Sequence, residues 1–205
     1  MKRLRWGLDI INKCVSDNTV VSVDTFRADV AKMCVEEYGV SMINDIAGGG
    51  LDPDMFKTVA RLGVPYILMH MKGTPQTMQK EPHYDDLLGE MFLYFSEKVR
   101  ALCDLGVKDI ILDPGFGFAK TLEHNYKLLG HLEQFQEFKL PILVGVSRKS
   151  MIFRLFDASP EEALNGTTVI NAISLMKGAD ILRVHDVKPC VEAVKIYNEM
   201  MRFGD

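Results

Sequence analysis

The chain has 205 residues, with 24 Lys or Arg against 28 Asp or Glu and a formal net charge of -4. Hydrophobic residues make up 47% of it, yet no run approaches the roughly 18 uncharged apolar residues of a membrane-spanning helix. Disordered and membrane-embedded proteins are therefore excluded as classes. No Lys/Arg-rich block gives an electrostatic reason to expect binding of nucleic acid or an anionic membrane. The length predicts one domain over 1–205.

The cysteines are scattered: Cys14, Cys34, Cys103 and Cys190. Without a Cys-x-x-Cys pair, this spacing predicts neither a zinc site nor a disulfide framework. The N-terminal stretch is positively charged but is interrupted by polar residues, which argues against a secretory signal. We therefore expect reduced thiols and a cytoplasmic protein.

Six short, β-rich apolar runs recur along the chain, at 20–24, 41–46, 65–70, 109–114, 141–147 and 181–186. Between them lie helix-length stretches with apolar residues at helical spacing, as in Leu88, Met91 and Phe95 or in Val191 and Val194. Alternating strands and helices predict an α/β protein whose parallel strands are covered on both faces by crossover helices.

Polar side chains collect where these runs end: Asp24, Asn44, Asp45, His70, Asp113, Ser147, Arg148, Lys149, Arg183, His185 and Asp186. The carboxyl ends of parallel strands form the ligand-binding edge of α/β sheets and barrels. A single strand-end Asp is as often a helix cap as a functional residue. Six polar strand ends in series favour a site at one edge.

Two glycine-containing segments do not match nucleotide-binding motifs. In DPGFGFAK (113–120), the third glycine of G-x-G-x-x-G would fall at Lys120, and GVSRKS (145–150) lacks the first glycine of a P-loop. The second segment still ends a strand with two cations and a Ser150 that begins an expected helix, where free N–H groups favour an anion. The alternative at this point is a solvated basic turn.

The residue types at the strand ends indicate the chemistry of a ligand. Arg183 and His185 alternate along an expected strand and so point the same way, and with Lys149 they could grip a diphosphate. Three other strand ends suit a flat heterocycle with amino and lactam groups: Asp24, Asn44 and Asp113. We therefore predict a nitrogen heterocycle linked to a diphosphate.

Seven blocks resemble, in order, those of dihydropteroate synthases: SVDTF (22–26), INDIAGG (43–49), LMHMKGTPQTMQ (68–79), ILDPGFGFAK (111–120), VGVSRKSMI (144–152), NGTT (165–168) and LRVHDV (182–187). Methyltetrahydrofolate methyltransferases share a pterin-binding barrel, but the SRKS and RVHD blocks are similar to the synthases. The resemblance implies an α/β fold of the TIM (β/α)8-barrel type, incomplete here, with six parallel strands (the third to eighth) and surrounding helices. It also implies one pterin-binding domain over 1–205.

Members of this family condense 6-hydroxymethyl-7,8-dihydropterin diphosphate with p-aminobenzoate to give dihydropteroate and pyrophosphate in folate biosynthesis, a step with which sulfonamides compete. The matching blocks imply these substrate-binding residues: Asp24, Asn44, Met69, Asp113, Lys149, Ser150, Arg183 and His185. Ser150 would receive the p-aminobenzoate carboxylate. Lys149, Arg183 and His185 would be the catalytic residues, acting by positioning and by stabilising the departing diphosphate.

The family's first two strands, with an Asn-Val-Thr-Pro-Asp-type and a Gly-Gly-Glu-Ser-type loop, have no counterpart here. The resemblance implies Mg²⁺ on the diphosphate, but its usual Asn ligand belongs to the first of these loops, so no residue is assigned to a metal. A six-stranded remnant would expose two sheet edges, which favours a fragment of a longer synthase. The alternatives are a catalytically inactive pterin-binding module and a subunit that needs a partner chain. Dimers are common in the family, so a homodimer is the assembly to look for.

Overall fold

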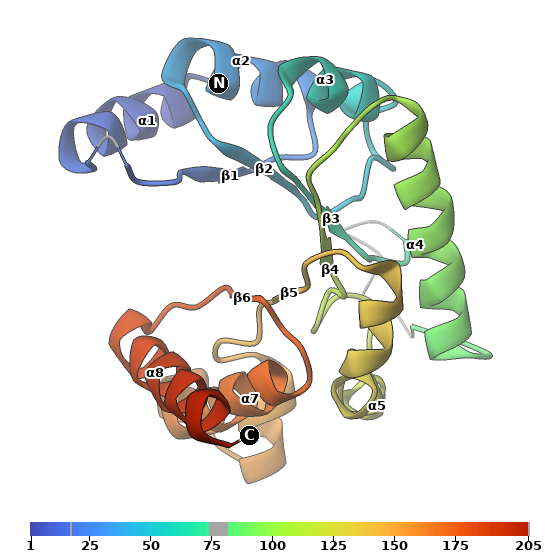
Figure 1. Cartoon of the computed structure of the whole chain (residues 1–205), viewed down its shortest axis with the longest axis vertical. Helices are drawn as coiled ribbons and strands as arrows, with labels where there is room; N and C mark the ends of the chain where they lie inside the picture. Colours follow the sequence, from blue (N-terminus) through green and yellow to red (C-terminus); the bar gives the residue numbers. More distant parts are fainter. Residues whose placement is uncertain (17, 74–81, 205) are drawn as a thin grey trace. The chain divides into compact units, whose positions relative to one another are not determined.

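The computed structural model describes residues 1–16, 18–73 and 82–204 (Figure 1). Residues 74–79 of the LMHMKGTPQTMQ block lie outside these ranges. The chain packs as two compact units, one formed by Met1–Met69 with Phe95–Ile111 and the other by His70–Tyr94 with Leu112–Asp205. The single pterin-binding domain over 1–205 stays a prediction.

The first unit contains three parallel strands, β1 (Ser22–Asp24), β2 (Met42–Asp45) and β3 (Tyr66–Met69). Ser22 is opposite Met42, and Ile43 is opposite Tyr66. All four residues of β3 are buried, as expected for a parallel strand covered on both faces. Strand ends that lie far apart in the sequence thus become neighbours in register.

The helices of the first unit are α1 (Lys2–Cys14), α2 (Ala28–Tyr38), α3 (Met55–Leu62) and the later part of α4 (Leu87–Asp104). Helices α2 and α3 lie side by side (Figure 1). Gly39 and Gly63 end them in the left-handed conformation, with φ of 65° and 66°, which glycine adopts without a Cβ clash. The chain is thereby turned from each helix into the next strand.

The remaining strands are β4 (Ile110–Asp113), β5 (Leu143–Val144) and β6 (Ile181–Leu182). Within the first unit, the Tyr66 amide donates to the Asp109 carbonyl at 2.9 Å. In the second, β5 and β6 pair in parallel and a bridge joins Leu112 to Ile142. Across the sheets, hydrogen-bonded neighbours occur in the order β1-β2-β3-β4 and β5-β6. All six described strands fall inside the six predicted runs.

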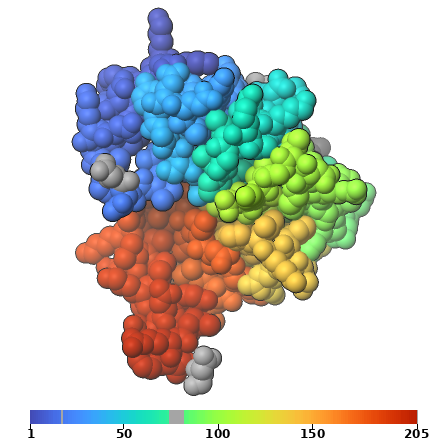
Figure 2. All heavy atoms as spheres, turned by 45° about the horizontal axis from the view of Figure 1, so that its top comes forward, coloured from blue at the N-terminus to red at the C-terminus, as the bar shows by residue number. Residues whose placement is uncertain are grey.

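The second unit holds the start of α4 and the elements α5 (Leu122–Gly130), η1 (Leu132–Phe138), α6 (Ser150–Phe153), η2 (Arg154–Phe156), η3 (Pro160–Ala163), α7 (Leu164–Met176) and α8 (Val187–Phe203). Helices α7 and α8 pack together, and the last turns of α8 project from this unit (Figure 2). Val191 and Ile196 of α8 are exposed, so the apolar spacing there marks a surface of this chain. No helix in the described ranges is long and apolar enough to cross a membrane.

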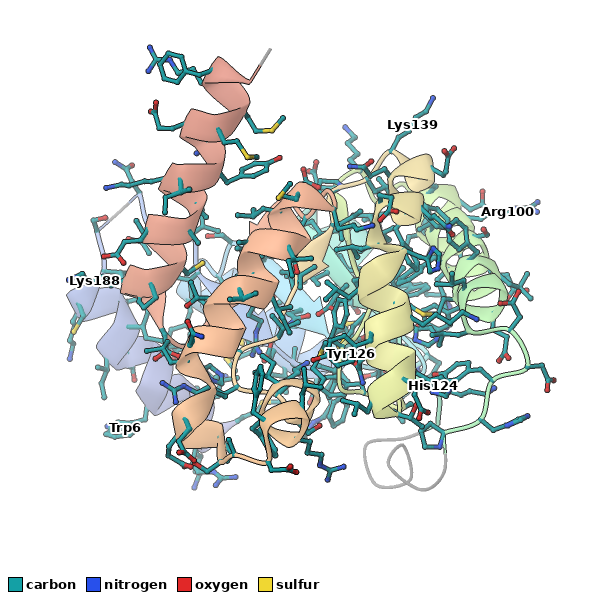
Figure 3. The ribbon with its side chains drawn as sticks, turned by 90° about the horizontal axis from the view of Figure 1, so that it is seen from below. Trp6, Arg100, His124, Tyr126, Lys139 and Lys188 are labelled. Atoms are coloured by element: carbon teal, nitrogen blue, oxygen red, sulfur yellow. The ribbon has the colours of Figure 1, made fainter. Side chains whose placement is uncertain are left out.

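Thr121 caps α5, the helix that follows the loop after β4. Its Oγ1 accepts from the His124 amide at 3.1 Å, while its own amide donates to Nδ1 of His124 at 3.2 Å; His124 lies at the start of this helix (Figure 3). We expect Thr121→Ala to lower the free energy of unfolding by about 1 kcal/mol, measured by urea denaturation. Thr121→Ser keeps the acceptor and is the control. Equal stability of the two variants would show that the cap contributes nothing.

Candidate active site

In the first unit, Asp24 and Asn44 are opposite each other in the β1–β2 register. Nδ2 of Asn44 donates to Oδ1 of Asp24 at 2.5 Å. Asn44 is buried, and its Oδ1 accepts no hydrogen bond from any described residue. A buried acceptor left unpaired costs about 1–3 kcal/mol. This oxygen is therefore suited to a ligand that brings an N–H donor.

Asp45, the next residue of β2, is fully buried and has a structural function. Its carboxylate accepts from the Tyr66 hydroxyl at 2.7 Å and from the amides of Ala47 and Gly49, both at 2.8 Å. Burial raises the pKa of Asp45, and these three hydrogen bonds oppose that rise. Asp45 thus shapes the loop after β2.

Met69, which the resemblance places in the pterin site, ends β3 and is also buried.

In the second unit, Asp113 ends β4 and is buried. Its Oδ1 accepts from the Gly115 amide at 2.8 Å. Burial raises the pKa of this carboxyl, and the Gly115 hydrogen bond and three nearby cations oppose the rise: Lys149, Lys120 and Arg183. The end of β4 therefore combines one buried carboxylate with several positive charges.

Lys149 connects the end of β5 to the loop after β4. Its ammonium donates to the Phe116 carbonyl and lies 4.7 Å from the centre of the Phe118 ring. Burial lowers the pKa of Lys149 to about 8, while the charge of Asp113 raises it and that of Arg183 lowers it. Two of the predicted site residues, Lys149 and Asp113, are therefore electrostatically coupled in this unit.

Ser150 begins a helix, as predicted, but α6 has only four residues and continues as η2. One helical turn carries little of the dipole of a long helix, so the dipole argument for an anion at Ser150 is weak. Ser150 also lines a cavity of about 340 Å³, together with Thr121, Asn125 and Arg154. Tyr126 of α5 (Figure 3) donates from its hydroxyl to the Met151 carbonyl at 2.8 Å. This bond fixes α6 beside α5.

Arg183 and His185 follow β6, because the strand ends at Leu182. The strand predicted over 181–186 is therefore too long. The Arg183 amide still donates to Val144 O at 2.8 Å, but the His185 amide donates to the Ser147 hydroxyl at 3.1 Å. A side chain thus replaces the backbone acceptor of a regular ladder. Alternation along a strand does not determine where these two exposed residues point.

Arg148 joins the loops after β5 and β6. Its Nε and Nη2 donate to the two carboxylate oxygens of Asp186 at 2.9 and 3.0 Å. Its Nη1 donates to the carbonyls of Pro160 and Glu161 at 3.0 and 2.7 Å. Arg148 itself has the left-handed conformation, with φ of 51°. The cation beside Lys149 is therefore occupied in a structural ion pair.

Lys120 and His70, which sequence reasoning gave no particular function, meet in the second unit. Nζ of Lys120 lies 3.1 Å from Nδ1 of His70, 3.0 Å from Gly115 O and 3.1 Å from Phe118 O. Both side chains are buried. The signal in the sequence is a lysine that follows an apolar Gly-Phe-Gly-Phe-Ala segment, so its charge needs partners within an apolar surrounding.

The described residues do not fit a metal ion held by the protein alone. Among 1–16, 18–73 and 82–204, no three His, Cys, Asp or Glu residues are placed to hold one. The Asn that the resemblance links to Mg²⁺ has no counterpart in the sequence.

A model of the family described as pterin binding enzyme matches residues 1–185. The dihydropteroate synthase of Escherichia coli (strain K12) is 44% identical over 178 residues, which is 86% of this chain and 62% of that protein. The solved Yersinia pestis dihydropteroate synthase with a sulfonamide drug complex has a TM-score of 0.89 and 38% identity, covering 95% of this chain and 70% of that one. The Thermus thermophilus enzyme in complex with 6HMPPP gives a TM-score of 0.88 at 35% identity, over 95% and 77%.

These structures confirm the predicted α/β fold of the TIM-barrel type, to which this chain contributes parallel strands and their helices. The chain spans 62% of the length of its E. coli relative. The family match extends from residue 1 to residue 185 and so includes all six described strands. The chain therefore belongs to the pterin-binding enzyme family, among its dihydropteroate synthases.

Proposed function

We propose that this chain acts as a dihydropteroate synthase, a transferase that joins 6-hydroxymethyl-7,8-dihydropterin diphosphate to p-aminobenzoate in folate biosynthesis. The observation that carries the proposal is the end of β4, where buried Asp113 lies in the field of Lys149, Lys120 and Arg183. A carboxylate can accept from the amino and ring N–H groups of a pterin, while Lys149 and Arg183 suit its diphosphate. Family membership supports this assignment.

In this proposal, Asp113 accepts hydrogen bonds from the pterin ring. The Asp24–Asn44 pair of the first unit, with its unpaired Asn44 oxygen, suits a pterin by its own donor and acceptor chemistry. Met69 supplies apolar surface for the ring, since a thioether adapts well to flat aromatic groups.

The reaction breaks the bond between the exocyclic carbon of the pterin and the diphosphate oxygen, and the electron pair leaves with pyrophosphate. The arylamine nitrogen then bonds to that carbon and loses a proton. Arg183, His185 and Lys149 stabilise the negative charge that builds up on the departing diphosphate. No nucleophilic side chain is needed, because the chain binds and orients the two substrates.

For p-aminobenzoate, we assign the carboxylate to Ser150. Support comes from the polar cavity that Ser150 lines with Arg154, whose guanidinium matches a carboxylate. The hydroxyl of Ser150 carries this assignment without help from a helix dipole, because α6 is so short.

Calorimetry with the pterin diphosphate, followed by a pyrophosphate-release assay with and without p-aminobenzoate, tests the function. The proposal expects binding and release that depends on the arylamine. Binding without release would favour the inactive pterin-binding module, and release only after a second protein is added would favour a chain that needs a partner. No binding at all would overturn both the synthase and the module.

The affinity for the pterin diphosphate should fall at alkaline pH. The pKa of Lys149 is about 8 because of burial, so raising the pH through 8 removes a positive charge that the diphosphate needs. One proton linked in this way predicts about a fivefold loss of affinity between pH 8 and pH 9. Lys149→Arg stays charged and should flatten the profile; an equally steep fall in this variant would assign the titration to another group.

We also propose a cytoplasmic location and a homodimer. The four cysteines are free thiols, as in proteins of a reducing compartment. Helices α7 and α8 present a mostly apolar groove with exposed Val169, Met176 and Ile196, and a second copy would cover such a surface. Light scattering over a range of concentrations tests the dimer.

A further inference from the structure

Lys120 is a buried cation that also lines the cavity of Ser150 and Arg154. It is 5% exposed, and its ammonium has three neighbours within hydrogen-bond distance: Gly115 O, Phe118 O and Nδ1 of His70. An ammonium offers three donors and no acceptor. The three acceptors therefore satisfy all three N–H groups of the buried ammonium.

Two of those acceptors belong to the loop 115–118, which connects β4 to the residues before α5. Gly115 donates its amide to Asp113 at 2.8 Å and accepts from Lys120 on its carbonyl at 3.0 Å. Its φ of 71° is left-handed, so the orientation of its two peptide groups depends on these contacts. Lys120 thus holds the residue that donates to the carboxylate of Asp113.

The other end of the loop is held in the same way. Phe118 accepts from Lys120 on its carbonyl at 3.1 Å, and its ring lies 4.7 Å below the ammonium of Lys149. Phe116, between them, accepts from Lys149. Lys120 binds the loop from inside the unit, and Lys149 contacts it where the substrate is expected.

His70 completes the arrangement. Because the Lys120 ammonium can only donate, Nδ1 of His70 has to accept, and a neutral ring then carries its proton on Nε2. Burial lowers the pKa of His70 far below its usual value, and the charges of Lys120 and Lys72 lower it further. The ring also packs edge-on against the Tyr94 ring, with 4.9 Å between the two ring centres. The backbone amide of His70 donates to Asp113 O at 2.9 Å.

We infer that Lys120 is a positioning residue that holds the 115–118 loop in the conformation that presents Asp113 and Lys149 to the pterin diphosphate, and that it fixes His70 as the Nε2-protonated tautomer. The ligand named here rests on the proposed function; the loop and the tautomer do not. Toward the pterin diphosphate, Lys120 acts through Gly115 and Phe118.

The first test reads the tautomer in the full chain. Burial lowers the pKa of Lys120 to about 7, so nitrogen NMR of the histidine rings at pH 6 observes mainly the ammonium. We expect His70 to be neutral with its proton on Nε2. A proton on Nδ1 in the wild-type chain would overturn the inference without any mutation. This measurement does not depend on whether the chain binds a pterin.

The second test compares Lys120→Met, Lys120→Gln and Lys127→Met. Met fills similar space without a donor, Gln keeps two donors without the charge, and Lys127 is an exposed control on α5. We expect Met to give a mixed His70 tautomer and to weaken pterin diphosphate binding at least tenfold, Gln to restore part of the affinity, and the control to match wild type. If Met does not fold, Gln carries the comparison.

Unchanged affinity in the folded Lys120 variants would overturn the positioning function, even if the tautomer changed. Loss of affinity with an unchanged His70 ring would overturn the link through His70. If the wild-type chain binds no pterin diphosphate, the proposed function fails, and the tautomer measurement still decides whether Lys120 holds His70 as described.

Discussion

Asp113→Asn is expected to weaken binding of the pterin diphosphate by about 10²–10³-fold. The carboxylate is buried in the field of Lys149, Lys120 and Arg183. An uncharged amide leaves those cations without their compensating charge, and removing one partner of a buried charge pair costs about 3–5 kcal/mol. The amide also turns one of two acceptors into a donor, facing the pterin N–H groups that the carboxylate would accept.

The variant is best measured by calorimetry beside Asp109→Asn, because Asp109 is exposed and immediately precedes β4, at the end opposite Asp113. The control should bind like wild type. A further readout is the pH profile: Asp113 raises the pKa of Lys149, so its loss should shift the alkaline fall in affinity below pH 8. Affinity within threefold of wild type would remove Asp113 from the pterin site.

Arg148→Met is expected to reduce kcat/KM by about 10²-fold, although this guanidinium is occupied by other protein groups. Arg148 donates to both oxygens of Asp186 and to two carbonyls of the 160–161 segment. Without these bonds, neither Lys149 beside it nor His185 beside Asp186 keeps its backbone position. A displacement of about 1 Å in a catalytic group can cost 10²-fold in rate.

The comparison needs Arg148→Lys and Arg100→Met. Lysine keeps the charge but cannot form the two-pronged pair, so it should recover only part of the rate. Arg100 is exposed on α4 (Figure 3), so Arg100→Met should leave kcat/KM unchanged. Asp186→Asn should add little to Arg148→Met, because the two residues act as one unit. Fully additive losses, or a lysine variant as active as wild type, would contradict this function of the Arg148–Asp186 ion pair.

The strands and helices could be predicted because their signals are local. Apolar runs ended by Gly39 or Gly63 marked both the helix ends and the strand starts. Parallel strands bring their carboxyl ends to one edge, and this placed Asp113 at the end of β4 and Asn44 opposite Asp24. Those inferences required only periodicity and one topological rule.

What could not be predicted depends on contacts between distant segments. The amide of His185 is drawn to the Ser147 hydroxyl, so β6 ends early. Lys120 finds His70, a residue 50 positions away. In the sequence, Lys120 resembles a surface lysine as much as a buried one. Only its three acceptors reveal that its charge is used inside the protein.

The unpaired oxygen of Asn44 has a consequence for selectivity. In the free chain this atom is buried and has no donor among the described residues. The folded chain therefore carries the cost of an unpaired buried acceptor before any ligand binds. A ligand with an N–H at that position removes the cost, whereas one with a lone pair or a methyl group there keeps it. At about 1–3 kcal/mol, the difference corresponds to about five- to 150-fold in affinity, which competition between a pterin and its N-methylated analogue would measure. One amide oxygen would then make binding selective for the ring tautomer that carries an N–H at this position, although the tautomers have the same size and shape.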